Sequence, residues 1–147
     1  MSDLYSKDIL RLASQIPLGE LAGAVDVEVQ KTSRICGSRV TLKGQLSADK
    51  LSFNEVAVVV KACALGQASV GFFAPHIKGI TLAESQSLRA LLADILLGTK
   101  DAPDESDPHD GQWAGLKVFE PAREHRGRHS SILLILDTVI EGLSPNK

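Results

Sequence analysis

The spacing of hydrophobic residues changes along the chain, and the first pattern is helical. Between Asp3 and Ile16 the apolar residues recur mostly three or four positions apart. This spacing predicts a short amphipathic helix that Ser2 or Asp3 caps and that Pro17 ends.

The next stretch has a period of two, which is typical of strands. Valines alternate with polar residues from Val25 to Gln30, and apolar residues keep this period from Val40 to Leu46. After a turn at Ser47–Lys50, the stretch from Leu51 to Lys61 is rich in β-branched valines. Three successive strands with short links predict an antiparallel meander.

Helical patterns return after Cys63. A small-residue segment from Ala64 to Ala74 predicts one helix. A longer helix begins at a capping box of Thr81 and Glu84 and ends at Gly98, where a glycine commonly terminates helices.

The final segment, Ser130 to Leu143, is apolar over a broad face, and we expect Ser130 or Ser131 to cap it. The order of elements predicts one domain over residues 1–147, of the α+β class. It has a three-stranded antiparallel sheet, with an N-terminal helix and C-terminal helices packed on one face.

Residues 99–112 break the helical pattern. They hold five carboxylates, one lysine and two prolines, which predicts an acidic, mobile loop. His109 and the carboxylates could form a metal site, but the spacing of a calcium loop is missing, so a solvated loop is the preferred interpretation.

Composition limits the classes of function. The chain has 147 residues, with 16 Lys and Arg against 18 Asp and Glu, and this near-neutral charge argues against nucleic acid as a main partner. Residues 1–7 include Asp3 and no apolar run, so we expect no secretory leader, and no apolar run in the sequence is long enough to span a membrane. With only 2 cysteines, a disulfide scaffold is excluded, and we expect a cytoplasmic protein with reduced thiols.

The two cysteines lie where chemistry is favoured. Cys36 precedes a strand and is followed by Gly37, which permits a tight turn. Cys63 stands where a strand gives way to a helix, and the positive end of a helix dipole favours the thiolate. The alternative interpretation is that each cysteine is a small buried hydrophobic residue.

A basic cluster, residues 123–131, lies just before the last helix and contains His129. Two cysteines and one histidine from three loops at one end of the sheet form a workable site for zinc or iron. Alternatively, the arginines of this cluster pair with the acidic loop. A further alternative is an enzyme in which Cys63 is the nucleophile and His129 or His125 the base.

Three short motifs follow one another in a distinctive order: Cys36-Gly37-Ser38, the helix start Cys63–Ser69 with its Ala-Ser, and His129–Leu133. They resemble the Cys-Gly-Asp, Cys…Ala-Ser and His-Cys motifs of the IscU/NifU/SufU family of iron–sulfur cluster assembly scaffolds. The resemblance extends from about Tyr5 to Leu143 and implies a SufE/NifU-like fold.

The resemblance also implies a function, which is that of a scaffold and not of an enzyme. Cys36, Cys63 and His129 would bind iron, a [2Fe–2S] cluster or zinc, and Ser130 or Ser38 could complete the coordination. The implied partners are a cysteine desulfurase and recipient apoproteins. Exposed arginines would attract acidic partners of this kind: Arg123, Arg126 and Arg128.

Two positions depart from the family pattern. Ser38 replaces the aspartate after Cys-Gly, and Ser130 replaces the third cysteine. A serine hydroxyl is a harder ligand than a thiolate and suits soft metals less well. The alternative function is therefore an interaction or regulatory module that keeps the fold and no longer assembles clusters. Sulfur transfer through a cysteine is a further, weaker alternative.

Overall fold

The computed structural model describes residues 6–16, 21 and 23–145. Helix α1 covers Lys7–Ala13, and the Ser6 hydroxyl caps it by accepting a hydrogen bond from the backbone N–H of Ile9. The sequence-based prediction ended this helix at Ile16, three residues too late. The expected caps Ser2 and Asp3, and the expected terminator Pro17, lie outside the described residues.

The three-stranded antiparallel meander is confirmed. Its strands are β1 (Val27–Thr32), β2 (Arg39–Leu46) and β3 (Phe53–Lys61), which pair in the order β1-β2-β3. Val29 pairs with Leu42, which pairs with Val58, so these apolar side chains share one face. The first strand begins at Val27, two residues later than the valine pattern indicated.

The helices after the sheet are also confirmed, with three additions. They are α2 (Ala64–Phe73), α3 (Leu82–Leu97) and α4 (His129–Leu143). The capping box of Thr81 and Glu84 is present, and Gly98 ends α3 in the left-handed conformation with φ of 82°. The additions are 3₁₀ helices, which the sequence-based prediction did not include: η1 (Ala74–His76), η2 (Gly111–Glu124) and η3 (Arg126–Arg128). The acidic segment predicted at 99–112 contains no helix or strand as far as Asp110.

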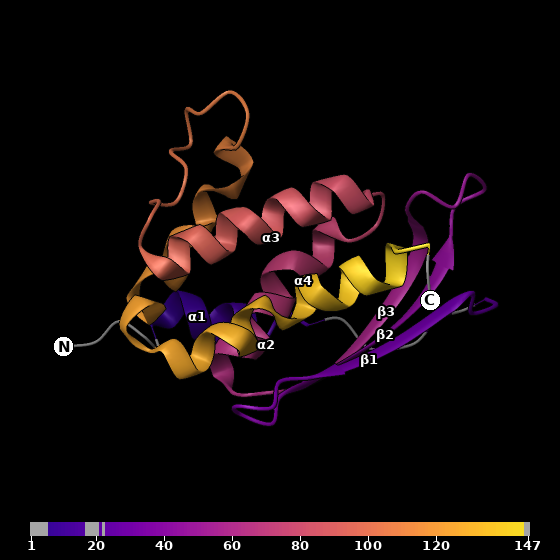
Figure 1. Cartoon of the computed structure of the whole chain (residues 1–147), viewed down its shortest axis with the longest axis horizontal. Helices are drawn as coiled ribbons and strands as arrows, with labels where there is room; N and C mark the ends of the chain where they lie inside the picture. Colours follow the sequence, from indigo (N-terminus) through magenta and orange to yellow (C-terminus); the bar gives the residue numbers. More distant parts are fainter. Residues whose placement is uncertain (1–5, 17–20, 22, 146–147) are drawn as a thin grey trace.

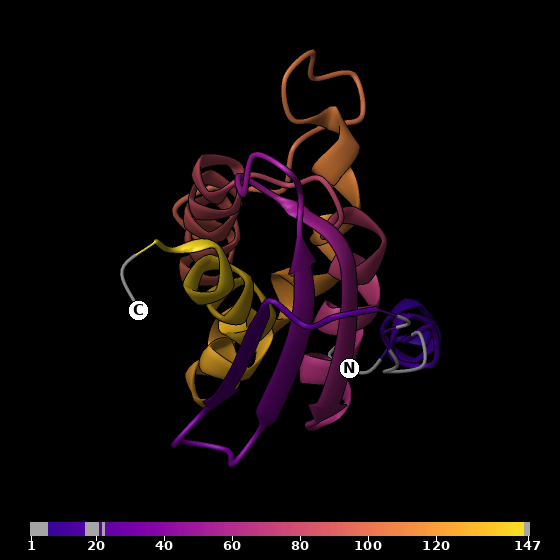
Figure 2. The same ribbon diagram turned by 90° about the vertical axis from the view of Figure 1, so that its right-hand side faces the viewer.

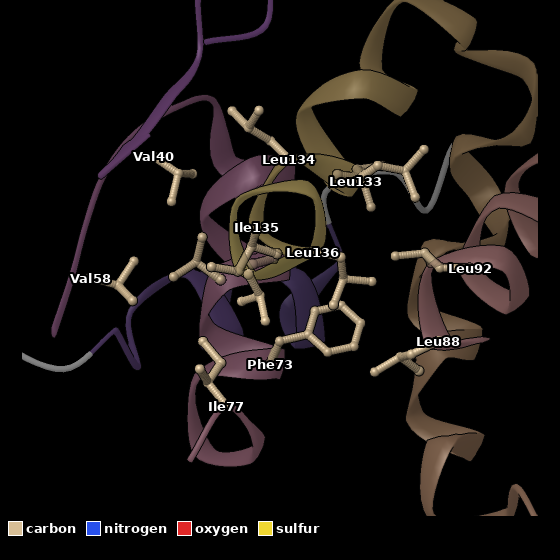
Figure 3. Packing of buried hydrophobic residues seen from close by; sticks show 14 of the residues in the cluster. Val40, Val58, Phe73, Ile77, Leu88, Leu92, Leu133, Leu134, Ile135 and Leu136 are labelled. Carbon is tan, nitrogen blue, oxygen red and sulfur yellow. The ribbon is translucent and has the colours of Figure 1, made fainter. Parts of the chain in front are cut away.

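Helices lie against one face of the sheet, as predicted (Figures 1 and 2). Helix α4 packs directly on β1 and β2, α2 and α3 pack on α4, and α1 packs on α2. In Figure 3, Val40 and Val58 of the sheet face Ile135 of α4, and Leu92 approaches from α3. All four side chains are at most 4% exposed, so the core lies between the sheet and the helices.

The burial pattern explains why α4 occupies the centre. Ten of its fifteen residues are buried, because the sheet covers one side of the helix and α2 and α3 cover others. Within the described part of the chain, no helix is both long enough and apolar enough to cross a lipid bilayer.

Candidate functional site

The β1–β2 connection is a tight loop that presents Cys36 at one end of the sheet. The backbone N–H of Ser33 donates to the carbonyl of Ser38 at 2.8 Å, and the N–H of Gly37 donates to the carbonyl of Ser33 at 2.8 Å. Gly37 has φ of 70°, a conformation that glycine adopts without strain. The loop therefore places Cys36 between two serines.

Cys63 reaches the same end of the sheet from the following connection. It is the N-cap residue of α2, as its place in the sequence predicted, and its carbonyl accepts a hydrogen bond from the N–H of Gln67. Its side chain does not cap the helix; the sulfur lies 3.8 Å from the hydroxyl oxygen of Ser131.

The first residues of α4 complete the site. The prediction that Ser130 or Ser131 caps this helix is wrong: Arg128 is the N-cap residue, and no side chain caps the helix. The two hydroxyls have other partners. Ser130 is hydrogen-bonded to Ser33 at 2.7 Å, and Ser131 is hydrogen-bonded to Ser38 at 2.7 Å.

Six side chains from three segments thus form one hydrogen-bonded group, which we call the serine–cysteine cluster: Ser33, Cys36, Ser38, Cys63, Ser130 and Ser131. The members of the cluster differ in how deeply they are buried. Ser33, Ser38 and Ser131 are 4%, 2% and 2% exposed, whereas both cysteines are half-buried. The thiols therefore lie nearer to solvent than the hydroxyls that support them.

Close packing behind the cluster fixes Ser131. A Cβ atom added to Gly66 of α2 would lie 2.5 Å from the Ser131 hydroxyl and 2.8 Å from the Cβ of Ala62. Only a glycine at this position lets α2 and α4 approach so closely. The position of the Ser131 hydroxyl therefore depends on the contact between the two helices.

The cluster changes the acidity of one thiol. Burial raises the pKa of Cys36, but hydrogen bonds from Ser33, Ser38 and Ser131 favour its thiolate more strongly, and the pKa falls from 9.0 to about 7. A thiolate is the form of cysteine that binds metals and attacks electrophiles. Near pH 7 a substantial fraction of Cys36 is therefore thiolate and can bind a metal or attack an electrophile.

His129 is adjacent to the cluster in sequence but has a different partner. It is the first residue of α4, and its Nε2 atom lies 2.7 Å from the carbonyl oxygen of Ala122. If Nε2 carries the proton in this bond, Nδ1 keeps a free lone pair, an arrangement that is common for histidines that bind metals.

The predicted ligand set is not assembled in the structure. Among the described residues, no three His, Cys, Asp or Glu side chains lie together closely enough to hold a metal ion. This holds both for Cys36, Cys63 and His129 and for His109 with the acidic loop. The first set stays a prediction.

The basic residues before α4 fall into two groups. Arg123 binds the acidic loop, donating to the carbonyl of Lys100 at 2.7 Å and to the carboxylate of Asp101 at 3.1 Å. Pairing with the acidic loop was the alternative interpretation, and it is correct for this arginine. Arg126 and Arg128 form no ion pair with any described residue.

Sequence reasoning missed Ser33 and the role of Ser131. Ser33 stands at the end of β1, three residues before Cys36, which is a spacing that a tight turn brings together. That spacing is a usable signal. The depth of Ser131 is not readable from the sequence, because it depends on how α2 and α4 approach each other.

Comparison with known proteins identifies the class. A crystal structure of a nitrogen-fixing NifU-like protein, N-terminal part, from Brucella abortus has 33% sequence identity and a TM-score of 0.81, over 96% of this chain and 92% of that one. A protein from Fervidobacterium islandicum, named as an iron–sulfur cluster assembly scaffold of the SUF system, has 20% identity and a TM-score of 0.76, over 96% and 97%. No protein-family model and no curated protein matches the chain.

The first of these likenesses covers nearly the whole of both chains at an identity that shows common ancestry, and the second supports the fold. The chain belongs to the IscU/NifU/SufU family.

Proposed function

We propose that the protein is an iron–sulfur cluster assembly scaffold that binds its cargo at the serine–cysteine cluster. The cargo is iron, a [2Fe–2S] cluster or zinc, and Cys36 and Cys63 supply the thiolates. The observation that carries this proposal is that residues far apart in sequence bring both thiols to one end of the sheet and link both to Ser131.

Two serines, Ser130 and Ser131, are candidates for the third protein ligand. Family resemblance assigned the missing cysteine to Ser130, and Ser130 is bonded to Ser33 and not to either cysteine. Ser131 lies against Cys63 and also favours the Cys36 thiolate. We therefore assign the third position to Ser131. His129 remains a candidate for the next ligand, because one of its ring nitrogens is free of the Ala122 contact.

A site with two thiolates and a hydroxyl is incompletely closed for a soft metal. Such a site releases its cargo more readily than a set of three or four thiolates would. This suits transfer to a recipient and not storage, and the protein acts as a carrier and not as an enzyme. The cytoplasm, where thiols stay reduced, suits two free cysteines.

The proposed partners are a cysteine desulfurase and recipient apoproteins. Arg126 and Arg128 stand just before α4 without an ion pair among the described residues, and they would attract acidic surfaces. Ile35, which is 70% exposed beside Cys36, would add an apolar contact at the same place. Arg123 is removed from this role by its bonds to the acidic loop.

The test is anaerobic reconstitution of the purified protein with iron, sulfide and a cysteine desulfurase. We expect the visible absorption of a cluster in the wild type, and we expect its loss in Cys36→Ala and in Cys63→Ala. Arg11→Ala, a change at an exposed ion pair on α1, is the control and should leave the spectrum intact.

The same experiment separates the alternative function. If the wild type forms no cluster and binds neither iron nor zinc, the protein is an interaction or regulatory module with the family fold. An unchanged cluster in both cysteine variants would contradict the assigned ligands. The feature that supports this alternative is Ser130, which stands at the position of the family's third cysteine.

A further inference from the structure

A second site lies away from the serine–cysteine cluster. A cleft of about 730 Å³ opens between α3, the turn after η1 and the end of the acidic loop, and none of the six cluster residues lines it. Figure 1 shows the acidic loop standing out beyond α3 on this side of the molecule. The volume is within the usual range for ligand sites. The residues that matter most for its chemistry are His76, Glu84, Asp94, Lys100, Asp110 and Trp113.

Two aromatic rings form part of the wall. The rings of His76 and Trp113 meet edge to face, with their centroids 4.9 Å apart. Phe72 and Phe73 support Trp113 at 6.4 and 6.3 Å. Burial lowers the pKa of His76, so this ring is neutral at pH 7 and brings no positive charge to the cleft. The rings of His76 and Trp113 thus give the cleft an aromatic surface, and Phe72 and Phe73 support it.

Some charged side chains of the cleft have an ion-pair or hydrogen-bond partner, and others have no ion pair. The ammonium of Lys78 lies 2.7 Å from the carboxylate of Glu55, and Glu84 accepts the hydrogen bonds of the α3 capping box. Asp94 and Asp110 form no ion pair with any residue in the described ranges. Lys100 is the one lysine of the lining whose ammonium has no such pair. Two carboxylates therefore remain available beside the aromatic wall.

The adjoining loop extends the negative charge beyond the cleft. Asp104, Glu105 and Asp107 are exposed and face solvent. Hydrogen bonds from the backbone of the same loop lower the pKa of Asp104 and of Asp107, so both stay ionised well below neutral pH. A positively charged ligand longer than one side chain would meet carboxylates both in the cleft and on its rim.

We propose that the cleft binds an arginine side chain in an extended basic segment of a partner protein, with Asp94 and Asp110 pairing with the guanidinium and Trp113 contacting its plane. Arginine fits this wall better than lysine, because its planar group both pairs with carboxylates and stacks on aromatic rings. The rim charges of the acidic loop favour a segment with further basic residues. This site shares no residue with the serine–cysteine cluster and does not depend on metal or cluster binding there.

The single tryptophan of the chain provides the measurement, because Trp113 lies in the cleft. The full-length protein is titrated with a synthetic hexapeptide that carries two arginines, and Trp113 fluorescence is recorded. We expect a saturable change that weakens as salt is added. We expect the Asp94→Asn/Asp110→Asn double variant to bind at least tenfold more weakly.

Three controls decide the outcome. Glu28→Gln, on the opposite face of the sheet, should leave peptide affinity unchanged. A peptide with citrulline in place of arginine should not bind, and free arginine amide should bind at least tenfold more weakly than the peptide. Equal binding of the citrulline peptide, equal binding of free arginine amide, or no fluorescence change with the arginine peptide would each overturn the proposal.

Discussion

The serine–cysteine cluster and the cleft beside α3 hold their polar groups in opposite ways. In the cluster, the hydroxyls of Ser33, Ser38 and Ser131 are at most 4% exposed, and each is hydrogen-bonded to a hydroxyl of another segment of the chain. In the cleft, the carboxylates of Asp94 and Asp110 have no ion-pair partner among the described residues and keep their contact with water. Burial makes an unpaired polar group costly, whereas exposure makes it cheap.

This difference determines how rigid each region is and how it responds to substitution. None of the buried side-chain nitrogen and oxygen atoms in the described part of the chain lacks a hydrogen-bond partner. The hydrogen bonds therefore fix the geometry of the cluster before cargo binds. A substitution at one member should also affect the hydrogen bonds of the others. The cleft has no such network, so its residues should respond to substitution almost independently.

The largest expected effect comes from giving the cluster a third thiol. Ser131→Cys places sulfur beside Cys63 and close to Cys36, so zinc would meet three thiolates in place of two. We expect zinc affinity to rise by on the order of 100-fold, equivalent to about 2.8 kcal/mol. Competition with a chromogenic chelator measures it.

Ser130→Cys is the matched control for that change. The Ser130 hydroxyl bonds to Ser33 and not to a cysteine, so a thiol there should raise zinc affinity much less. A larger gain for Ser130→Cys than for Ser131→Cys would show that Ser130 holds the third position after all, as the resemblance first suggested.

A smaller effect is expected from disturbing the packing behind the cluster. Gly66→Ala adds a methyl group that would lie 2.5 Å from the Ser131 hydroxyl and 2.8 Å from the Cβ of Ala62. Alanine is the better helix former by about 1 kcal/mol, yet overpacking of this kind typically costs about 1–3 kcal/mol. We expect a net loss in the free energy of unfolding, measured by urea denaturation.

Gly127→Ala serves as the comparison, since the nearest atom to its added methyl group lies at 3.9 Å and belongs to the exposed Ile35. Its stability should stay close to that of the wild type. If Gly66→Ala proves more stable than the wild type, the contact between α2 and α4 is looser than the cluster geometry requires.

The smallest expected effect concerns the acidity of Cys36. Because the pKa of this thiol lies at about 7, its alkylation rate should rise with pH through a midpoint near 7 and level off above it. In Ser33→Ala, which removes one hydrogen bond to the thiolate, the midpoint should move up by roughly one unit, about 1.4 kcal/mol.

Iodoacetamide labelling followed by mass spectrometry resolves Cys36 from Cys63. The double substitution Asp94→Asn/Asp110→Asn provides the control from the cleft and should leave the Cys36 midpoint where it is. A midpoint near 9 in the wild type would mean that the serines do not stabilise the thiolate.

Local patterns predicted most of the fold. The alternation of valines, the Thr81–Glu84 capping box and the glycine at the end of α3 were each readable from neighbouring residues, and the structure has them all. The largest unpredicted element is η2, Gly111–Glu124, whose buried residues Leu116, Phe119 and Ala122 recur at the three-residue period of a 3₁₀ helix. Its Leu116 and Phe119 are buried by packing against distant elements.

The site was predictable only in part, for a related reason. The positions of Cys36 and Cys63 at the ends of elements follow from local order, and the structure confirms both positions. The bonds of Ser130 and Ser131 do not follow from local order. Both serines have the residue type of a helix cap, but tertiary contacts with the hairpin compete successfully for their hydroxyls.

The bonds that complete the cluster join residues 97 and 93 positions apart in the sequence. During synthesis the hairpin with Cys36 leaves the ribosome long before Ser130 and Ser131 do, and contacts of such wide separation form late in folding. The link between the Cys36 loop and Cys63 through Ser131 therefore arises only when the chain is almost finished. A nascent or truncated chain carries both cysteines and the hydroxyls of Ser33 and Ser38, but not the Ser131 hydroxyl that joins the two thiols, so the complete cluster also reports that folding is complete.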